Sequence, residues 1–324
     1  MAIKYNRIGS LTELLKKLKE QDVDNFHTLD EIRSFRNNFN NSLNFIKQKN
    51  KEYLLQDIIN LESEYKKLSP GLDYAIKGRE ELLIKEKTEI ILQIAHLENT
   101  KNIIMVLINW FKKRKMLKRN FILETQFKEE IKRPFQNQIN KIDLLKQEYA
   151  DKKNNIEKWV DSLSKEEINR NKFILSLLDE NNPLFYGAEG EELAFGELVK
   201  LPDSYVVIND YRRQFDRPIY DRKNDDRIHS IQIDHIVVGP TGIYLVETKN
   251  WSQDSAENRD LFSPVKQLRR SSFAMFVLLN QAIDNGKLSV FNQNWGEQKI
   301  SPKNIILFIN HKPVKEFQYV KILS

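Results

Sequence analysis

Glycine and proline are distributed unevenly along the chain. Residues 1–180 contain two prolines and three glycines, whereas the shorter stretch 181–324 contains seven of each. Because these residues interrupt regular secondary structure, we expect long elements in the first stretch and short ones in the second. The sequence therefore predicts two domains, residues 1–180 and residues 181–324, joined near Asn181-Asn182-Pro183. A length of 324 residues agrees with this number.

Apolar residues in the first stretch recur at alternating intervals of three and four. This spacing is typical of helices that pack lengthwise, as in a coiled coil or an antiparallel bundle. We expect their apolar side chains to serve packing. The three runs are Leu54, Ile58, Leu61, Tyr65 and Leu68; Ile90, Ile94, Leu97, Ile104, Ile108 and Phe111; and Ile142, Leu145, Tyr149, Ile156, Trp159 and Leu163.

Two prolines divide the predicted helices. The first helix is expected over about residues 31–69, where Ser69-Pro70-Gly71 should break it and reverse the chain. Pro134 should end or kink the next helix at about Arg133, because the residue before a proline disfavours helical geometry.

The net charge of +6 arises in residues 1–180, since residues 181–324 hold 18 basic and 18 acidic side chains. Lys112, Lys113, Arg114 and Lys115 directly follow the apolar stretch 103–111. That stretch is shorter than the roughly 20 apolar residues that a membrane-spanning helix needs, so no spanning segment is expected. Two alternatives stay open for the cluster: a solvated helix face, or a surface that binds phosphates of a nucleic acid or of an anionic membrane.

The chain contains no cysteine. This excludes a disulfide scaffold, a cysteine-ligated metal site and a cysteine nucleophile. The first residues lack the apolar segment of a signal peptide, so a cytoplasmic location is expected.

The second stretch has the pattern of an α/β domain with a mixed central sheet. Two adjacent predicted strands are apolar on both faces, which is typical of strands covered on each side. The predicted elements are a helix at 187–200, a strand at 205–208, a polar loop at 210–230, strands at 231–238 and 243–249 joined by Gly239-Pro240-Thr241-Gly242, a helix at 265–282 and a strand at 304–309.

The hairpin formed by the two apolar strands determines the expected chemistry. If Pro240-Thr241 is its two-residue loop, Asp234 lies directly across from Glu247, with Cβ atoms about 5 Å apart. Lys249 follows Glu247 by two residues and points to the same face. A slip of one residue would separate the two acids.

Two facing carboxylates in an apolar sheet repel each other unless a cation lies between them. Mg²⁺, which prefers oxygen ligands, meets this requirement. A lysine beside such an ion orients or deprotonates a water, or stabilises a phosphate. The set Asp234, Glu247 and Lys249 therefore indicates metal-assisted phosphodiester hydrolysis.

The same residues carry a resemblance to a known family. Asp234, a gap of 12 residues and Glu247-Thr248-Lys249 resemble the D…ExK signature of the restriction-endonuclease-like PD-(D/E)XK superfamily. Four motifs within about residues 184–310 are similar to the nuclease-related domain (NERD) family. They are Gly187-Ala188-Glu189-Gly190-Glu191, residues 232–239, residues 242–250 and Pro264-Val265-Lys266-Gln267.

The resemblance implies roles for individual residues. Asp234 and Glu247 would bind Mg²⁺, with Mn²⁺ as a substitute, and the main-chain carbonyl of Thr248 would be a third ligand. Lys249 would be the catalytic lysine. An acid on the first helix often completes such sites, and Glu191 matches it. The helical pattern independently places Glu191 on the buried face, because apolar residues follow it at intervals of three, four and seven.

The helix after Lys249 supplies further candidates. Gln267 would lie near the site, or would be an ordinary surface amide. Lys266, Arg269 and Arg270 would meet phosphates. His235 points away from Asp234 and is expected to be a buried core histidine.

The leading interpretation is a Mg²⁺-dependent nuclease that acts on DNA more than RNA, by analogy with the superfamily. A role in prokaryotic defence or DNA processing fits such a domain. The helices of residues 1–180 would form a homo-oligomer, position DNA or bind a protein partner. One alternative is a nucleic-acid-binding scaffold without activity, and another is a protein whose 112–115 cluster docks on a membrane surface.

Overall fold

The computed structural model describes the chain except residues 98–102, 252, 254–261, 289–298 and 312–317. Two compact units are present: residues 1–39 together with 170–324, and residues 40–169. Residues 1–39, which the sequence analysis grouped with the long helices, thus pack with the C-terminal part of the chain.

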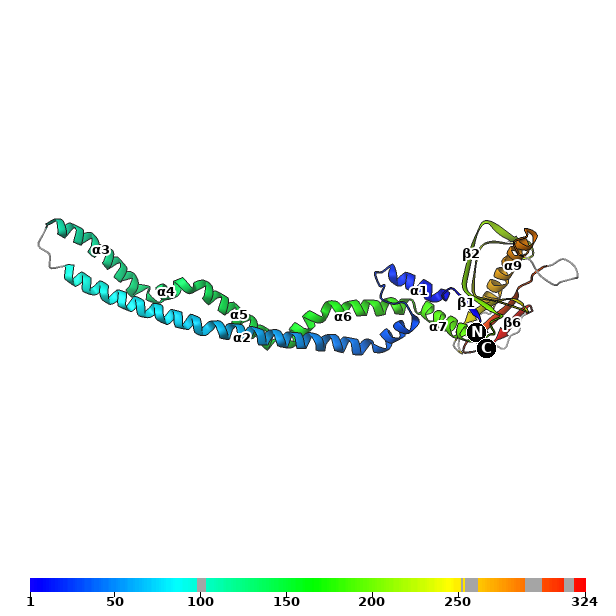
Figure 1. Ribbon diagram of the computed structural model, residues 1–324, viewed down its shortest axis with the longest axis horizontal. Coiled ribbons are helices and arrows are strands. Elements are labelled where there is room, and N and C mark those ends of the chain that lie inside the picture. Colours follow the sequence, from blue (N-terminus) through cyan, green and yellow to red (C-terminus); the bar gives the residue numbers. More distant parts are fainter. Residues whose placement is uncertain (98–102, 252, 254–261, 289–298, 312–317) are drawn as a thin grey trace. The chain divides into compact units, whose positions relative to one another are not determined.

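Long helices dominate residues 29–180, as predicted. Helix α2 spans 69 residues, and the following helices run antiparallel to it within residues 40–169 (Figure 1). Ion pairs join Lys152 to Asp57 and Arg119 to Glu86, which lie far apart in sequence. The helices are α2 (Leu29–Leu97), α3 (Ile103–Thr125), α4 (Phe127–Lys132), a 3₁₀ turn (Arg133–Phe135), α5 (Gln136–Asn154) and α6 (Ile156–Glu180).

The predicted break at Pro70 is wrong. Helix α2 continues through this residue, which is exposed. A proline removes one main-chain hydrogen bond, but apolar contacts on either side hold α2 against its neighbours. Leu54 and Ile58 pack with Val160, and Leu83 and Ile90 pack with Leu123.

The prediction for Pro134 is confirmed. Helix α4 ends at Lys132, and Pro134 lies in the 3₁₀ turn that precedes α5.

A six-stranded sheet forms the centre of the other unit. Its strand order follows the sequence, and the sheet is mixed because β2, β3 and β4 are antiparallel while the outer pairs are parallel. The fold class predicted from the sequence, long helices followed by an α/β domain with a mixed sheet, is confirmed. The strands are β1 (Ile3–Tyr5), β2 (Val206–Asp221), β3 (Asp226–Gly239), β4 (Gly242–Lys249), β5 (Lys303–Phe308) and β6 (Val320–Leu323).

Helices cover both faces of this sheet, which explains why β3 and β4 are apolar on both sides. Helix α7 (Asn182–Leu198) places Phe195 against Val237 and Val246. Helix α9 (Phe262–Asp284) places Leu268 against Ile233 and Leu245. Helix α1 (Gly9–Lys19) packs mainly on α7.

The polar loop predicted over residues 210–230 is wrong. Strands β2 and β3 continue through it as an antiparallel pair, with a bulge between Gln214 and Ile219. Many side chains of this segment are polar and face solvent, and for this reason the sequence predicted a loop. The buried side chains of Ile228 and Ile231 still anchor β3 to the core.

Candidate active site

The turn between β3 and β4 sets the register of the candidate site. Pairing runs from Gly239 opposite Gly242 to His235 opposite Val246, so the predicted two-residue loop and register are confirmed. One position further along, Asp234 faces Glu247. The main-chain N–H of Thr248 donates a hydrogen bond of 2.7 Å to Asp234 Oδ2, which ties the acid to the end of β4.

Glu247 and Lys249 project from the same face of β4, as predicted. Lys249 Nζ lies 2.6 Å from Glu247 Oε1. The Glu247 side chain is 3% exposed and that of Lys249 is 22% exposed. This ion pair is largely withdrawn from water, so each partner depends on the other for charge compensation.

Burial and neighbouring charges shift the pKa of Asp234 and of Lys249. Burial raises the pKa of Asp234, and the charge of Glu247 raises it further. Burial alone would lower the pKa of Lys249, but Glu247 and Asp234 raise that pKa above its ordinary value. Lys249 therefore carries its proton at neutral pH and acts as a fixed cation beside the acids.

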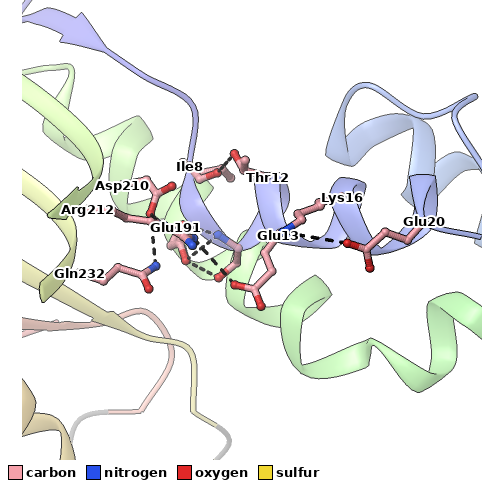
Figure 2. Close-up of polar contacts among 10 residues, drawn as sticks. Ile8, Thr12, Glu13, Lys16, Glu20, Glu191, Asp210, Arg212 and Gln232 are labelled. Carbon is pink, nitrogen blue, oxygen red and sulfur yellow. Dashed lines mark hydrogen bonds and ion pairs between the residues drawn. The ribbon is translucent and has the colours of Figure 1, made fainter. Parts of the chain in front are cut away.

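Glu191 projects from α7 and is buried, as the helical pattern predicted. Burial, with the nearby charge of Asp234, raises the pKa of Glu191 to about 7. Figure 2 shows Glu191 beside the first turn of α1. The neighbouring acids Glu189 and Glu192 instead share Arg33 of α2, at 3.0 and 2.9 Å.

Helix α7 lies unusually close to the end of β4 at Gly190. A Cβ atom on this glycine would come within 2.7 Å of Asn250 Cβ. The missing side chain therefore allows α7 to bring Glu191 toward the strand that carries Lys249.

A cavity of about 710 Å³ opens between these elements. Asp234, Lys249 and Glu191 line it, together with Thr248, Ser10 and Asn250. Glu247 is more deeply buried, in contact with Lys249. The structure thus brings together four of the five predicted catalytic residues.

Gln267 lies elsewhere. It is exposed on α9 and lines a second cavity, of about 1100 Å³, with Lys266, Arg269 and Arg270. Arg270 Nε lies 2.7 Å from Asp226 Oδ2, and Arg269 donates a hydrogen bond of 2.7 Å to the carbonyl of Gln318. These α9 residues border the β2–β3 turn rather than the cavity that contains the acids.

The basic cluster lies on α3, in the other compact unit. Lys112, Arg114 and Lys115 are exposed, and Lys113 is half-buried. The Arg114 guanidinium lies 5.5 Å from the centre of the Trp110 ring, and Trp110 is 52% exposed.

His235 is a buried core histidine, as expected. Its Nδ1 lies 2.8 Å from Asn209 Oδ1, and burial lowers its pKa to about 4. Its neighbour in sequence, Asp234, points to the opposite face of β3.

Two features near the acids were not anticipated from the sequence. Ser10, at the start of α1, donates to Glu191. Asp210, on β2, accepts hydrogen bonds from Arg212 at 2.7 Å and Gln232 at 3.2 Å (Figure 2). No motif in residues 1–20 predicts the contact between Ser10 and Glu191, because these two residues are 181 positions apart in the chain.

The donor set fits a hard cation such as Mg²⁺. No group of three or more Asp, Glu or His side chains is close enough to hold a metal ion within the described residues. Mg²⁺, however, is commonly held by one or two carboxylates and several waters. Asp234 and Glu247 supply two carboxylates, and the buried Thr248 Oγ1 has no hydrogen-bond partner among the described groups.

Comparison with known families agrees with this geometry. Residues 186–299 match the family described as nuclease-related domain (NERD). The chain therefore contains a nuclease-related domain, and this segment includes most of α7 and the strands β2 to β4, which carry the acids and Lys249. Neither curated proteins nor solved structures returned a match. In the part of the chain that is described, no helix is long and apolar enough to cross a membrane.

Proposed function

We propose that this chain is a metal-dependent nuclease that hydrolyses phosphodiester bonds, in DNA more than in RNA. The supporting observation is that Asp234, Glu247 and Lys249 meet at one end of the β3–β4 hairpin, beside the apolar side chains of these two strands. A buried carboxylate pair with a fixed cation has no evident packing role. The match of residues 186–299 to the nuclease-related domain supports the same reaction class.

Asp234 and Glu247 would hold Mg²⁺ or Mn²⁺, with the main-chain carbonyl of Thr248 as a further ligand and the carboxylate of Glu191 reaching the ion through a bound water. The ion, when bound, supplies Lewis-acid chemistry and a water of lowered pKa. Lys249 holds its proton and stabilises negative charge on the phosphate, because its ammonium group is already oriented by Glu247. Lys266, Gln267, Arg269 and Arg270 would contact the substrate away from the reacting bond.

The test is cleavage by the purified chain of supercoiled plasmid, linear duplex, single-stranded DNA and RNA, in Mg²⁺, Mn²⁺ or EDTA. We expect metal-dependent cleavage that Asp234→Asn and Glu247→Gln abolish. Glu197→Gln is the matched control, because Glu197 is an exposed acid of α7 paired with Lys200. Cleavage that persists in EDTA, or that the site variants leave unchanged, would contradict the proposal.

We further propose that the helical unit joins copies of the chain. Helix α2 exposes large apolar side chains that its antiparallel neighbours leave uncovered, including Ile59 at 57%, Leu82 at 58% and Leu92 at 65%. Such an assembly fits a role in prokaryotic defence or DNA processing. Sedimentation of the native chain should show an oligomer. A triple variant with Ile59→Gln, Leu82→Gln and Leu92→Gln should sediment as a monomer and keep the native helix content. A native monomer at micromolar concentration would contradict this.

A nucleic-acid-binding protein without catalysis is the second candidate. The exposed cluster of Lys112, Arg114 and Lys115 beside Trp110 favours it, since cations and aromatic rings together bind single strands. If this candidate function is correct, the chain should bind DNA in a salt-sensitive manner, and the Glu247→Gln variant should bind it equally well. Selective binding of the cluster to vesicles with acidic lipids would instead indicate a membrane surface as its partner.

A further inference from the structure

The first turn of α1 donates hydrogen bonds to the carboxylate of Glu191. The main-chain N–H of Ser10 lies 3.3 Å from Glu191 Oε1 and 3.2 Å from Oε2. The Ser10 hydroxyl donates a second hydrogen bond to Oε1. Amide groups at a helix start also carry partial positive charge, which favours a carboxylate at this position.

The approach of α1 to this acid is close. A Cβ atom on Gly9 would meet Asp210 Oδ1 at 2.6 Å, and one on Gly187 would meet Ser10 Oγ at 2.9 Å. Glycine at both positions lets the start of α1 enter the space between α7 and β2. Ser10 thereby reaches the wall of the cavity that also contains Asp234 and Lys249.

The segment before and after Ser10 is firmly anchored in the same compact unit. Strand β1 pairs in parallel with β2, with Ile3 opposite Val206. Asn6 and Asn209 exchange side-chain to main-chain hydrogen bonds of 3.2 and 3.3 Å. Beyond Ser10, α1 buries Leu11, Leu14 and Leu18 in a cluster with Leu178 and Phe185. Ser10 is therefore held in place from both sides.

We propose that Ser10 is a positioning residue of the nuclease site and that residues 3–19 belong to the catalytic unit. Ser10 acts by fixing the carboxylate of Glu191 at the cavity wall, so it extends the site beyond the 186–299 segment that matches the nuclease-related domain. This inference rests on the function proposed above, in which Glu191 assists Asp234 and Glu247.

The number of hydrogen-bonding positions on a carboxylate supports this role. An ionised carboxylate accepts at about four positions. The Ser10 hydroxyl donates to Oε1, its N–H is shared between Oε1 and Oε2, and the main-chain N–H of Gly9 donates to the same carboxylate. These three donors fix the orientation of the carboxylate and leave part of its accepting capacity available to a cation or to its bound water.

The test compares Ser10→Ala with Thr12→Ala. Both changes remove one hydroxyl from the first turns of α1, but the Thr12 hydroxyl bonds the carbonyl of Ile8 at 2.9 Å and not Glu191 (Figure 2). Binding of Mn²⁺ to each full-length variant is followed by electron paramagnetic resonance of the free ion. Cleavage of DNA is measured over the same Mn²⁺ range, and thermal unfolding verifies that each variant is folded.

Loss of a group that orients a metal ligand typically lowers affinity or activity by about 10–100-fold. We therefore expect Ser10→Ala to raise the Mn²⁺ concentration for half-occupancy by about tenfold or more. Ser10→Thr, which keeps the hydroxyl, should restore nearly native binding, and Thr12→Ala should bind like the native chain.

The outcomes separate this inference from the proposed function. Native-like Mn²⁺ binding by Ser10→Ala, or failure of Ser10→Thr to restore binding, would overturn the positioning role while the nuclease stands. Absence of Mn²⁺ binding and of cleavage in the native chain would instead overturn the proposed function, on which the inference depends.

Discussion

At the scale of single residues, the candidate site is an arrangement of buried charges. Asp234, Glu247, Glu191 and Lys249 are withdrawn from water, and burial together with neighbouring charges shifts the pKa of Asp234, Glu191 and Lys249. Burying such groups is unfavourable unless they are paired. Their burial among apolar side chains is therefore better explained by chemistry than by stability.

Replacement of Lys249 tests the role of the fixed cation. Lys249→Ala should lower cleavage by about 100-fold or more, because a preoriented charge that stabilises the transition state is lost. Lys200→Ala is the control, since Lys200 forms an exposed ion pair with Glu197. Single-turnover cleavage at saturating Mn²⁺ is the measurement, and equal rates for the two variants would contradict the assignment.

The buried His235 predicts a pH dependence of stability. Its pKa falls from 6.5 to about 4 on burial, so below about pH 6.5 the unfolded chain binds a proton that the folded chain does not. The contribution of His235 to stability is complete above pH 6.5, is lost progressively as the pH falls from 6.5, and is fully lost once the pH has fallen through 4. Between pH 7 and pH 5 the free energy of unfolding should fall by about 2 kcal/mol from this group.

The free energy of unfolding is measured with denaturant at both pH values, and hydrogen exchange of the β3 amides is then measured at the same pH values. His235→Gln should remove most of this pH dependence, whereas His229→Gln should retain it because His229 is exposed on the same strand. An equal pH dependence in His235→Gln would contradict the explanation.

At the scale of elements, a short turn and a close helix contact assemble the site. The Pro240-Thr241 loop sets the pairing of β3 with β4, and so determines which acids face each other. Gly190 determines how near α7 lies to β4. The first of these constraints is local and was predictable. The second depends on a contact with Asn250, 60 residues away in the chain, and was not.

Two glycines of α7 provide a matched comparison. Gly190→Ala should destabilise the protein by about 1–3 kcal/mol and reduce cleavage, because its Cβ would meet Asn250 at 2.7 Å and displace Glu191. Gly196→Ala, with no atom within 4 Å of its Cβ, should stabilise the helix by about 0.5–1 kcal/mol. Thermal unfolding and cleavage assays measure both, and a neutral Gly190→Ala would refute the close-contact explanation.

At the scale of the whole molecule, the two stretches 1–180 and 181–324 differ in charge. The excess of positive charge belongs to the long-helix part of the chain, and residues 111–120 hold six basic residues and no acid. The sheet-containing stretch 181–324 is neutral. The excess of positive charge therefore lies away from the stretch that carries Asp234, Glu247 and Lys249.

Neutralising this cluster tests its part in nucleic-acid binding. Replacing Lys112, Lys113, Arg114 and Lys115 with Gln should weaken DNA binding and flatten its dependence on salt, because fewer counterions are released. The control carries the same charge change on exposed lysines of α2, at Lys49, Lys51, Lys67 and Lys77. Fluorescence anisotropy at several salt concentrations is the measurement, and equal losses in both variants would exclude a specific role for the cluster.

The sequence by itself determined the features that depend on neighbouring residues. Helical spacing, sparse glycine and proline, and a two-residue loop predicted the long helices, the mixed sheet and the facing pair Asp234 and Glu247. Tertiary structure decided what depends on distant contacts: that α2 passes through Pro70, that Gln267 lines another cavity, and that Ser10 reaches Glu191. Short-range spacing leaves a pattern along the chain, whereas packing between distant segments selects positions that no local pattern marks.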